Sequence, residues 1–134
     1  MAVDFADTDA AGVVYHANYL SYMEKCRGDF LRARGVSSSW LASEYGVGCV
    51  VVKAEIDFRR PARLDDWLEI DLNVDDVKHT TAWCLQNVRK DDILLVEGRI
   101  KLATVSLQSG APVRMPAELR NCFKDSYETL SKPD

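Results

Sequence analysis

Two aspartates, a glycine and a histidine near the start of the chain have side chains or spacing that could serve hydrolytic chemistry. Asp7, Asp9, Gly12 and His16 lie in the stretch DTDAAGVVYHANY, residues 7–19. A carboxylate can attack an acyl carbon or take a proton from water, and an imidazole can donate a proton near neutral pH. An aspartate before a glycine turn is on its own usually a turn former. These residue types therefore permit hydrolysis without requiring it.

The elements that flank this stretch must position it. Residues from Ala17 to Arg34 include no proline and one glycine, and their apolar positions recur at approximately helical spacing. We expect the main helix here, ended by Gly35 as a C-terminal glycine cap. The first N–H groups of a helix lack intrahelical partners and lie at the positive end of its dipole. An oxyanion near His16 and Ala17 would therefore be stabilised.

Two further helices and a short first strand are also predicted. Ser38 or Ser39 could N-cap a short second helix, which Gly46 would end. Residues 117–130 could form a terminal helix. A short strand is expected before Asp7, joined by the motif to the main helix.

Four strands are predicted between the second helix and the terminal one, at residues 50–58, 68–75, 80–89 and 94–107. The first of these is expected to bury one face. That face comprises Val50, Val52, Ala54, Ile56 and Phe58. In the last strand the apolar positions switch faces after Leu102, which suggests a bulge or a two-sided contact. The order of elements predicts an α+β domain, with an antiparallel sheet wrapped on one helix.

The motif also carries a resemblance to a known family. The pattern D-x-D-x-x-G-V-V-Y-H-x-N-Y, followed by M-E-K-x-R, resembles the 4-hydroxybenzoyl-CoA thioesterase family, most closely its Tol-Pal-associated acyl-CoA thioesterase branch. The segment PARLDDWLEI at 61–70 resembles the same branch. The resemblance covers nearly the whole chain and implies one hotdog domain over residues 1–134. Because such relatives usually have a longer first strand, we expect that strand to be truncated here.

The resemblance implies roles for individual residues. Asp9 matches the catalytic carboxylate of the family, as nucleophile or general base. A backbone N–H at or beside His16 matches the oxyanion donor, and the His16 side chain could alternatively protonate the thiolate. The other expected substrate contacts are Gly12, Tyr15, Ala17, Arg59 and Arg60. Of these, the arginines have the charge to meet the phosphates of coenzyme A, although solvated turns rich in arginine are commoner than phosphate sites.

We therefore predict an acyl-CoA thioesterase that releases a free acid and the CoA thiol and requires no metal or redox cofactor. An acyl carrier protein is a second thioester source to consider. The resemblance implies a homo-oligomer, a dimer of hotdog subunits and commonly a tetramer. The alternative is a non-catalytic module that binds acyl-CoA or acyl carrier protein. A hydratase acting on enoyl-CoA is a weaker alternative, because no separate histidine and carboxylate motif is present.

Composition argues against several other classes of protein. A net charge of -4 and a pI near 5.2 do not favour nucleic acid. No stretch approaches the roughly 20 apolar residues of a membrane span, and the first residues do not resemble a secretory signal. The four cysteines are scattered without a C-x-x-C pair, so neither a zinc site nor a disulfide framework is expected. Reduced thiols predict a cytoplasmic location.

Overall fold

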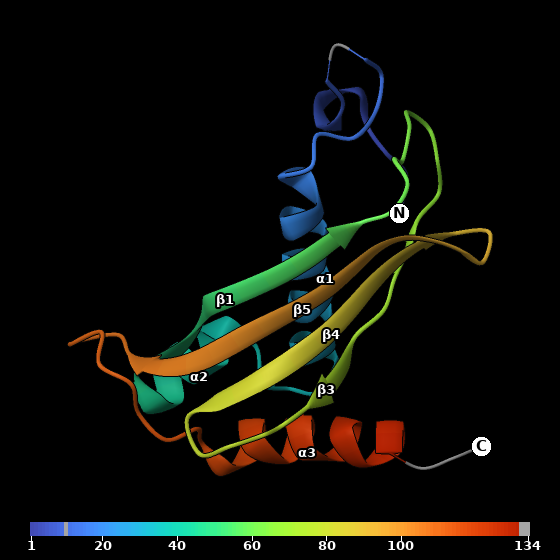
Figure 1. Ribbon diagram of the computed structural model, residues 1–134. Coiled ribbons are helices and arrows are strands. Elements are labelled where there is room, and N and C mark those ends of the chain that lie inside the picture. Colours follow the sequence, from blue (N-terminus) through green and yellow to red (C-terminus); the bar gives the residue numbers. More distant parts are fainter. Residues whose placement is uncertain (10, 132–134) are drawn as a thin grey trace.

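The computed structural model describes the backbone of residues 1–9 and 11–131, and the side chains of 1–9 and 11–125. Its elements, in chain order, are η1 (Phe5–Asp7), α1 (Asn18–Ala33), α2 (Ser38–Tyr45), β1 (Val47–Phe58), β2 (Glu69–Ile70), β3 (Asn73–Asp75), β4 (Thr81–Lys90), β5 (Ile93–Ser106) and α3 (Ala117–Ser131). The antiparallel strands run in the order β1-β5-β4-β2, and β3 also pairs with β4. Helix α1 crosses one face of this sheet (Figure 1). The predicted α+β arrangement is confirmed.

Helix α1 packs against the sheet through one apolar face. Its buried residues are Tyr19, Tyr22, Met23 and Leu31, and three of the four lie in its first half. Their separations of three, four and eight residues place them on one side of the helix. The N-terminal half of α1 is therefore the more deeply buried.

Both glycine caps are confirmed, whereas the predicted N-cap of α2 is wrong. Gly35 and Gly46 adopt φ of +74° and +64°, the left-handed conformation typical of a helix C-terminus. The cap of α2 is Ser37, whose hydroxyl accepts a hydrogen bond from the Trp40 N–H at 3.2 Å. Ser38 and Ser39 already belong to the helix, because the cap lies three residues before the amide that it satisfies.

The predicted inward face of β1 is wrong in its first half. The register between β1 and β5 shifts between Val51 and Lys53, so Val52 is the extra residue of a β-bulge. Before the bulge, Cys49 and Val51 pair with Thr104 and Leu102; after it, Ala54 pairs with Ile100, on the same face of β5. These β5 residues are all buried. Val50 and Val52 therefore belong to the opposite set of β1 residues.

The apolar switch in β5 coincides with burial of both faces of the strand. Leu102, Ala103 and Thr104 are all buried in succession, so both faces of the strand are covered there. The sequence predicted a bulge or a two-sided contact at this point. The two-sided contact is found on β5, and a bulge is found on the paired segment of β1.

The strand predicted over residues 68–75 is interrupted by Asp71. The Asp71 N–H donates to the Asn87 carbonyl at 3.1 Å, and the Asp71 carboxylate accepts the Asn87 N–H at 2.9 Å. The carboxylate thus takes the place of a backbone carbonyl in the ladder. It also forms an ion pair with Arg89. Two short strands, β2 and β3, result.

The short strand predicted before Asp7 is replaced by a single bridge and a 3-10 turn. Ala2 bridges Trp67, and the Val3 N–H donates to the Asp66 carbonyl at 2.9 Å. Phe5 to Asp7 then form η1. The segment is anchored because the Val3 side chain is buried.

The predicted terminal helix is present as α3. Leu119 and Phe123 are buried, and the Phe123 ring stacks on Phe30 of α1 with centroids 6.4 Å apart. In the part of the chain that the structure describes, no helix has the length and apolar character needed to cross a membrane.

We expect Gly98→Ala to destabilise the fold, because β5 and α1 touch at this position. A Cβ on Gly98 would lie 2.6 Å from the Met23 Cε and 2.9 Å from the backbone oxygen of Gln86. Met23 is fully buried, so the free energy of unfolding should fall by about 1–3 kcal/mol. Chemical denaturation measures this change. Gly48→Ala is the matched control, since its new Cβ meets the end of the exposed Leu107 side chain; an equal loss in both variants would contradict the explanation.

Candidate active site

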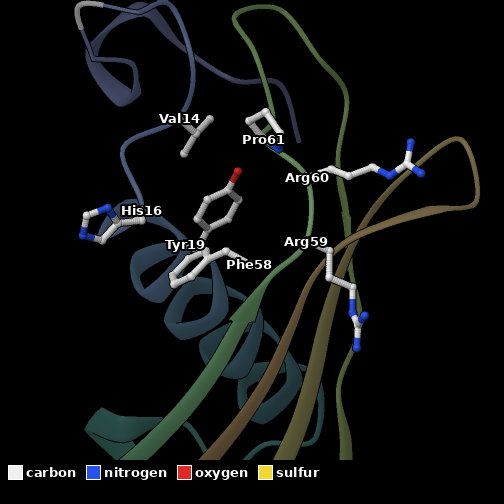
Figure 2. A pocket seen from close by; sticks show the side chains of 7 residues that line it. All are labelled: Val14, His16, Tyr19, Phe58, Arg59, Arg60 and Pro61. Carbon is white, nitrogen blue, oxygen red and sulfur yellow. The ribbon is translucent and has the colours of Figure 1, made fainter.

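A pocket of about 490 Å³ opens at the N-terminal end of α1 (Figure 2). Three segments form it: the end of the 7–19 motif, the first turn of α1, and the end of β1 with the residues that follow. It is lined by Val14, His16, Tyr19, Phe58, Arg59, Arg60 and Pro61. Most of its lining is apolar, with one imidazole and two guanidinium groups at its sides.

A tight turn places the motif beside this pocket. Thr8 bridges Val14, and within the turn the Asp9 N–H donates to the Val13 carbonyl at 2.9 Å. Gly12 has φ of +78°, and a Cβ there would have open space around it. The positive φ is what favours a glycine at this position, because no atom of the described residues comes close to it.

The Asp9 carboxylate is exposed at this turn. Its Oδ1 accepts the Ala11 N–H at 2.8 Å, which is the Asx turn that an aspartate commonly forms. Among residues 1–9 and 11–125, no hydrogen bond or ion pair occupies Oδ2. One carboxylate oxygen thus holds the loop, while the other is available to a ligand.

Hydrogen bonds tie the motif to the start of α1 and to the segment after β1. The Asn18 side-chain amide and the Tyr15 N–H both donate to the Asp7 carbonyl, at 2.8 and 2.9 Å. The Tyr19 hydroxyl accepts the Ala62 N–H at 2.9 Å. Burial raises the pKa of Tyr19, so this phenol is neutral at physiological pH. This hydrogen bond fixes the segment after β1 to the first turn of α1.

Two backbone donors at the helix start have no acceptor among the described residues. The Asn18 N–H donates to the Tyr15 carbonyl at 2.9 Å, and the Tyr19 N–H to the His16 carbonyl at 3.3 Å. The N–H groups of His16 and Ala17 donate to nothing in the described part of the chain. Because they lie at the positive end of α1, they are suited to an anionic oxygen.

Aromatic rings form one wall around these donors. The Tyr15 and His16 ring centroids are 4.7 Å apart, and His16 meets the edge of Phe58 at 5.8 Å. Tyr19 lies 5.7 Å from the same Phe58 ring. The His16 imidazole makes no hydrogen bond within the described residues, so ring contacts alone hold it.

The two arginines of the pocket differ in their partners. Arg59 forms an ion pair with Glu97, and its Nε donates to Oε2 of that residue at 3.0 Å. The Glu97 carboxylate also raises the pKa of Arg59. Arg60 has no ion pair within the described range. Both guanidinium groups point away from Tyr19 (Figure 2). Arg60 is therefore the more available cation.

The structure brings only part of the predicted site to the pocket wall. The lining includes His16, Arg59 and Arg60. Tyr15 contacts His16, Ala17 is the N-cap of α1, and Asp9 and Gly12 lie in the adjoining turn. The lining residues without a predicted role are Val14, Tyr19, Phe58 and Pro61. Tyr19 could have been found from its place one helical turn after His16.

The cysteines do not offer an alternative nucleophile at neutral pH. Burial raises the pKa of all four thiols, that of Cys84 to about 12. A thiol must be deprotonated to attack an acyl carbon. No three His, Cys, Asp or Glu side chains of the described residues are grouped so that they could hold a metal ion.

Comparisons with known proteins identify the family. The model described as "Thioesterase-like superfamily" matches residues 3–123. The acyl-CoA thioesterase YbgC of Haemophilus influenzae is 36% identical over 90% of this chain and 89% of its own length. The acyl-CoA thioester hydrolase YbgC of Escherichia coli is 35% identical over 91% of each chain.

A solved structure from Aquifex aeolicus, of a protein described only as hypothetical, superposes with a TM-score of 0.85. It is 32% identical and covers 92% of this chain and 95% of its own. At this coverage the likeness concerns most of the fold. This chain therefore has the hotdog fold and belongs to the thioesterase-like superfamily, as an enzyme of the thioester hydrolase class.

Proposed function

We propose that this protein hydrolyses acyl-CoA thioesters, with Asp9 as the reacting carboxylate and the His16 N–H as the principal oxyanion donor. The observation that carries the proposal is a pair of N–H groups, at His16 and Ala17, that have no acceptor among the described residues and lie beside an apolar pocket. One tight turn away, an Asp9 carboxylate oxygen likewise has no partner among those residues. The curated relatives named as acyl-CoA thioesterases support the same substrate class.

The chemistry needs only these groups and water. In one route an Asp9 oxygen bonds to the thioester carbon, the C–S bond breaks, and CoA leaves as a thiolate that gains a proton from solvent. Water then cleaves the resulting anhydride, which frees the acid and restores the carboxylate. In the other route Asp9 takes a proton from a water whose oxygen bonds to the thioester carbon, and the C–S bond then breaks to release the CoA thiolate and the free acid. In both routes a hydrogen bond from the His16 N–H would stabilise the negative charge that develops on the carbonyl oxygen.

A thiol-release assay tests the proposal. The protein is incubated with short-chain, long-chain and aromatic acyl-CoA thioesters, and free CoA thiol is followed with a disulfide dye. Release identifies a thioesterase and its acyl class. If acyl-CoA binds but no thiol appears, an acylated carrier protein is the next substrate; absence of release there as well would favour a non-catalytic binding module.

We expect Arg60→Ala to raise KM for acyl-CoA by about 10-fold, with little change in kcat, because a phosphate would lose a charge-assisted hydrogen bond. Arg59→Ala should have a smaller effect, since Glu97 already occupies that guanidinium. Initial rates on acyl-CoA measure both. A thioester of N-acetylcysteamine, which lacks the phosphates, is the control substrate: if Arg60→Ala raises its KM equally, Arg60 does not bind phosphate.

We also infer that the protein works as a homo-oligomer in the cytoplasm. Strand β1 is an edge of the sheet, and Val50, Val51 and Val52 on it are 41%, 47% and 54% exposed. A long apolar edge strand is normally covered. The four cysteines are free thiols, which supports a reducing compartment. A dimer is the smallest assembly that covers this edge, and a tetramer is the larger one to test for.

A further inference from the structure

The Asp9 carboxylate and the N–H groups of His16 and Ala17 belong to different segments, so their separation depends on contacts between those segments. Asp9 lies in the tight turn whose base is the bridge between Thr8 and Val14. The segment that carries this turn lies beyond the N-terminal end of α1 (Figure 1). A carboxylate that reacts while a helix terminus binds the oxyanion must hold its position to within about 1 Å, because small misplacements cost much of the rate.

One carbonyl oxygen joins the two segments. The Asp7 carbonyl accepts the Tyr15 N–H at 2.9 Å and the Asn18 side-chain amide at 2.8 Å. Tyr15 and Asn18 flank the two residues whose N–H groups have no acceptor among the described residues, and Asp7 precedes Asp9 by two residues. The two hydrogen bonds therefore run from the upstream arm of the turn to both sides of the oxyanion donors.

Helix stability alone does not explain an asparagine at position 18. Asn18 is the first residue of α1, and the N-cap before it, Ala17, makes no side-chain hydrogen bond. Polar side chains at a helix start usually accept backbone N–H groups of the first turn, whereas the Asn18 amide donates to a residue outside the helix. Asparagine also favours a helix less than alanine does. The contact with Asp7 does explain this residue.

Asn18 makes this contact away from the substrate pocket. It is not among the described residues that line the pocket at the helix start. Its hydrogen bond to Asp7 is partly buried and connects two segments. By contrast, the Thr8 hydroxyl donates to the Phe5 carbonyl at 2.8 Å, which is an exposed contact within one segment. Of these two side chains, Asn18 is thus the one that can set the position of the turn against α1.

The downstream arm of the turn is held separately. The Val14 N–H donates to the Ala62 carbonyl at 2.8 Å, and Val13 bridges Arg63. These contacts attach that arm to the segment after β1, and none of them uses the Asn18 amide. Removing the amide should therefore loosen the Asp9 side of the turn without detaching the whole loop.

From these contacts, and resting on the proposed hydrolysis, we propose that Asn18 is a positioning residue for the reaction. Through the Asp7 carbonyl it fixes the Asp9 carboxylate relative to the N–H groups of His16 and Ala17. It touches neither the thioester nor CoA. Its effect is on kcat, because the acyl carbon must lie within reach of the carboxylate while its oxygen meets the helix start.

Asn18→Ala tests this role by a split between kcat and KM. We expect kcat for thiol release to fall about 10- to 100-fold, with KM within about twofold of wild type, because positioning is lost and the pocket wall is not. Thermal unfolding should shift little, since alanine favours the helix. Thr8→Val is the matched control: it removes a side-chain hydrogen bond of the same length from the same segment, and its kcat should stay near wild type. A rise in KM alone, or an unchanged kcat in folded Asn18→Ala, would overturn the proposal.

A second variant and a double variant separate positioning from damage to the fold. Asn18→Asp keeps the shape of the side chain and suits a helix N-terminus, but its carboxylate cannot donate to a carbonyl, so it should fold and also lose kcat. In the Asp9→Asn background no reacting carboxylate remains to be positioned, so Asn18→Ala should lower the residual rate by less than about twofold. A further loss as large as that in wild type would assign Asn18 to the fold or to the oxyanion donors instead.

Residue-resolved amide hydrogen exchange provides a readout that does not depend on turnover. Exchange of the Tyr15 N–H, which the Asp7 carbonyl holds, should quicken in Asn18→Ala and Asn18→Asp. Exchange of the Val14 N–H, which the Ala62 carbonyl holds, should change little. Equal protection of Tyr15 in all three proteins would show that Asn18 does not hold the turn. If wild type releases no thiol, the proposed hydrolysis fails, and this exchange then decides by itself whether the contact holds the turn.

Discussion

Asp9→Asn is expected to lower kcat for thioester hydrolysis by a factor of about 10² to 10⁴, with the fold unchanged. An amide can neither attack the acyl carbon effectively nor take a proton from water. It does keep an oxygen where Asp9 Oδ1 accepts the Ala11 N–H at 2.8 Å, so the turn should survive. The measurement is thiol release from the best substrate of the panel, with circular dichroism and thermal unfolding on the same sample.

The matched control is Asp4→Asn, which removes another exposed carboxylate of the same N-terminal segment. Its turnover should stay near that of wild type. Asp9→Asn should also still bind acyl-CoA, because the pocket wall and the arginines are unaltered; calorimetry can measure this. Unchanged hydrolysis in a folded Asp9→Asn protein would remove Asp9 from the mechanism and leave it as a turn residue.

The parts of the fold that depend on local signals could be predicted from the sequence. The start and end of α1 follow from helical spacing and from Gly35, and the end of α2 follows from Gly46; both glycines have the positive φ that a C-terminal cap uses. The cap of α2 was missed by one residue, because three consecutive serines offer the same side chain. Only the geometry of the Ser37 hydroxyl and the Trp40 N–H selects one of them.

The departures in the sheet depend on partners that the local pattern does not display. The bulge at Val52 is defined by its pairing with β5, and the run Val50, Val51, Val52 has no alternation that could reveal it. The sequence pattern predicts Asp71 to be a polar, outward-facing position within one strand. In the structure it ends β2 because its carboxylate reaches Asn87, sixteen residues later. Similarly, Phe58 reaches the pocket only because β1 runs antiparallel to α1.

Replacing the proposed oxyanion donor gives the second large effect. His16→Pro removes the His16 N–H, and we expect kcat to fall by about 10² to 10³, the usual loss for one such donor. The structure leaves this N–H without an acceptor, so its removal breaks no hydrogen bond of the described fold. Thiol release under single-turnover conditions measures the chemical step directly and separates it from substrate binding.

Two neighbouring variants determine whether the backbone or the side chain is responsible. His16→Ala keeps the N–H and removes the imidazole, which packs against the rings of Tyr15 and Phe58; its kcat should stay within about 10-fold of wild type. Ala17→Pro removes the adjacent N–H at a residue whose φ of -65° already suits proline, and it should cost less than His16→Pro. If His16→Ala and His16→Pro are equally inactive while both are folded, the imidazole is the acid that protonates the leaving thiolate. If only Ala17→Pro is inactive, the oxyanion lies one residue further into α1, and the same helix terminus stabilises it through a different N–H.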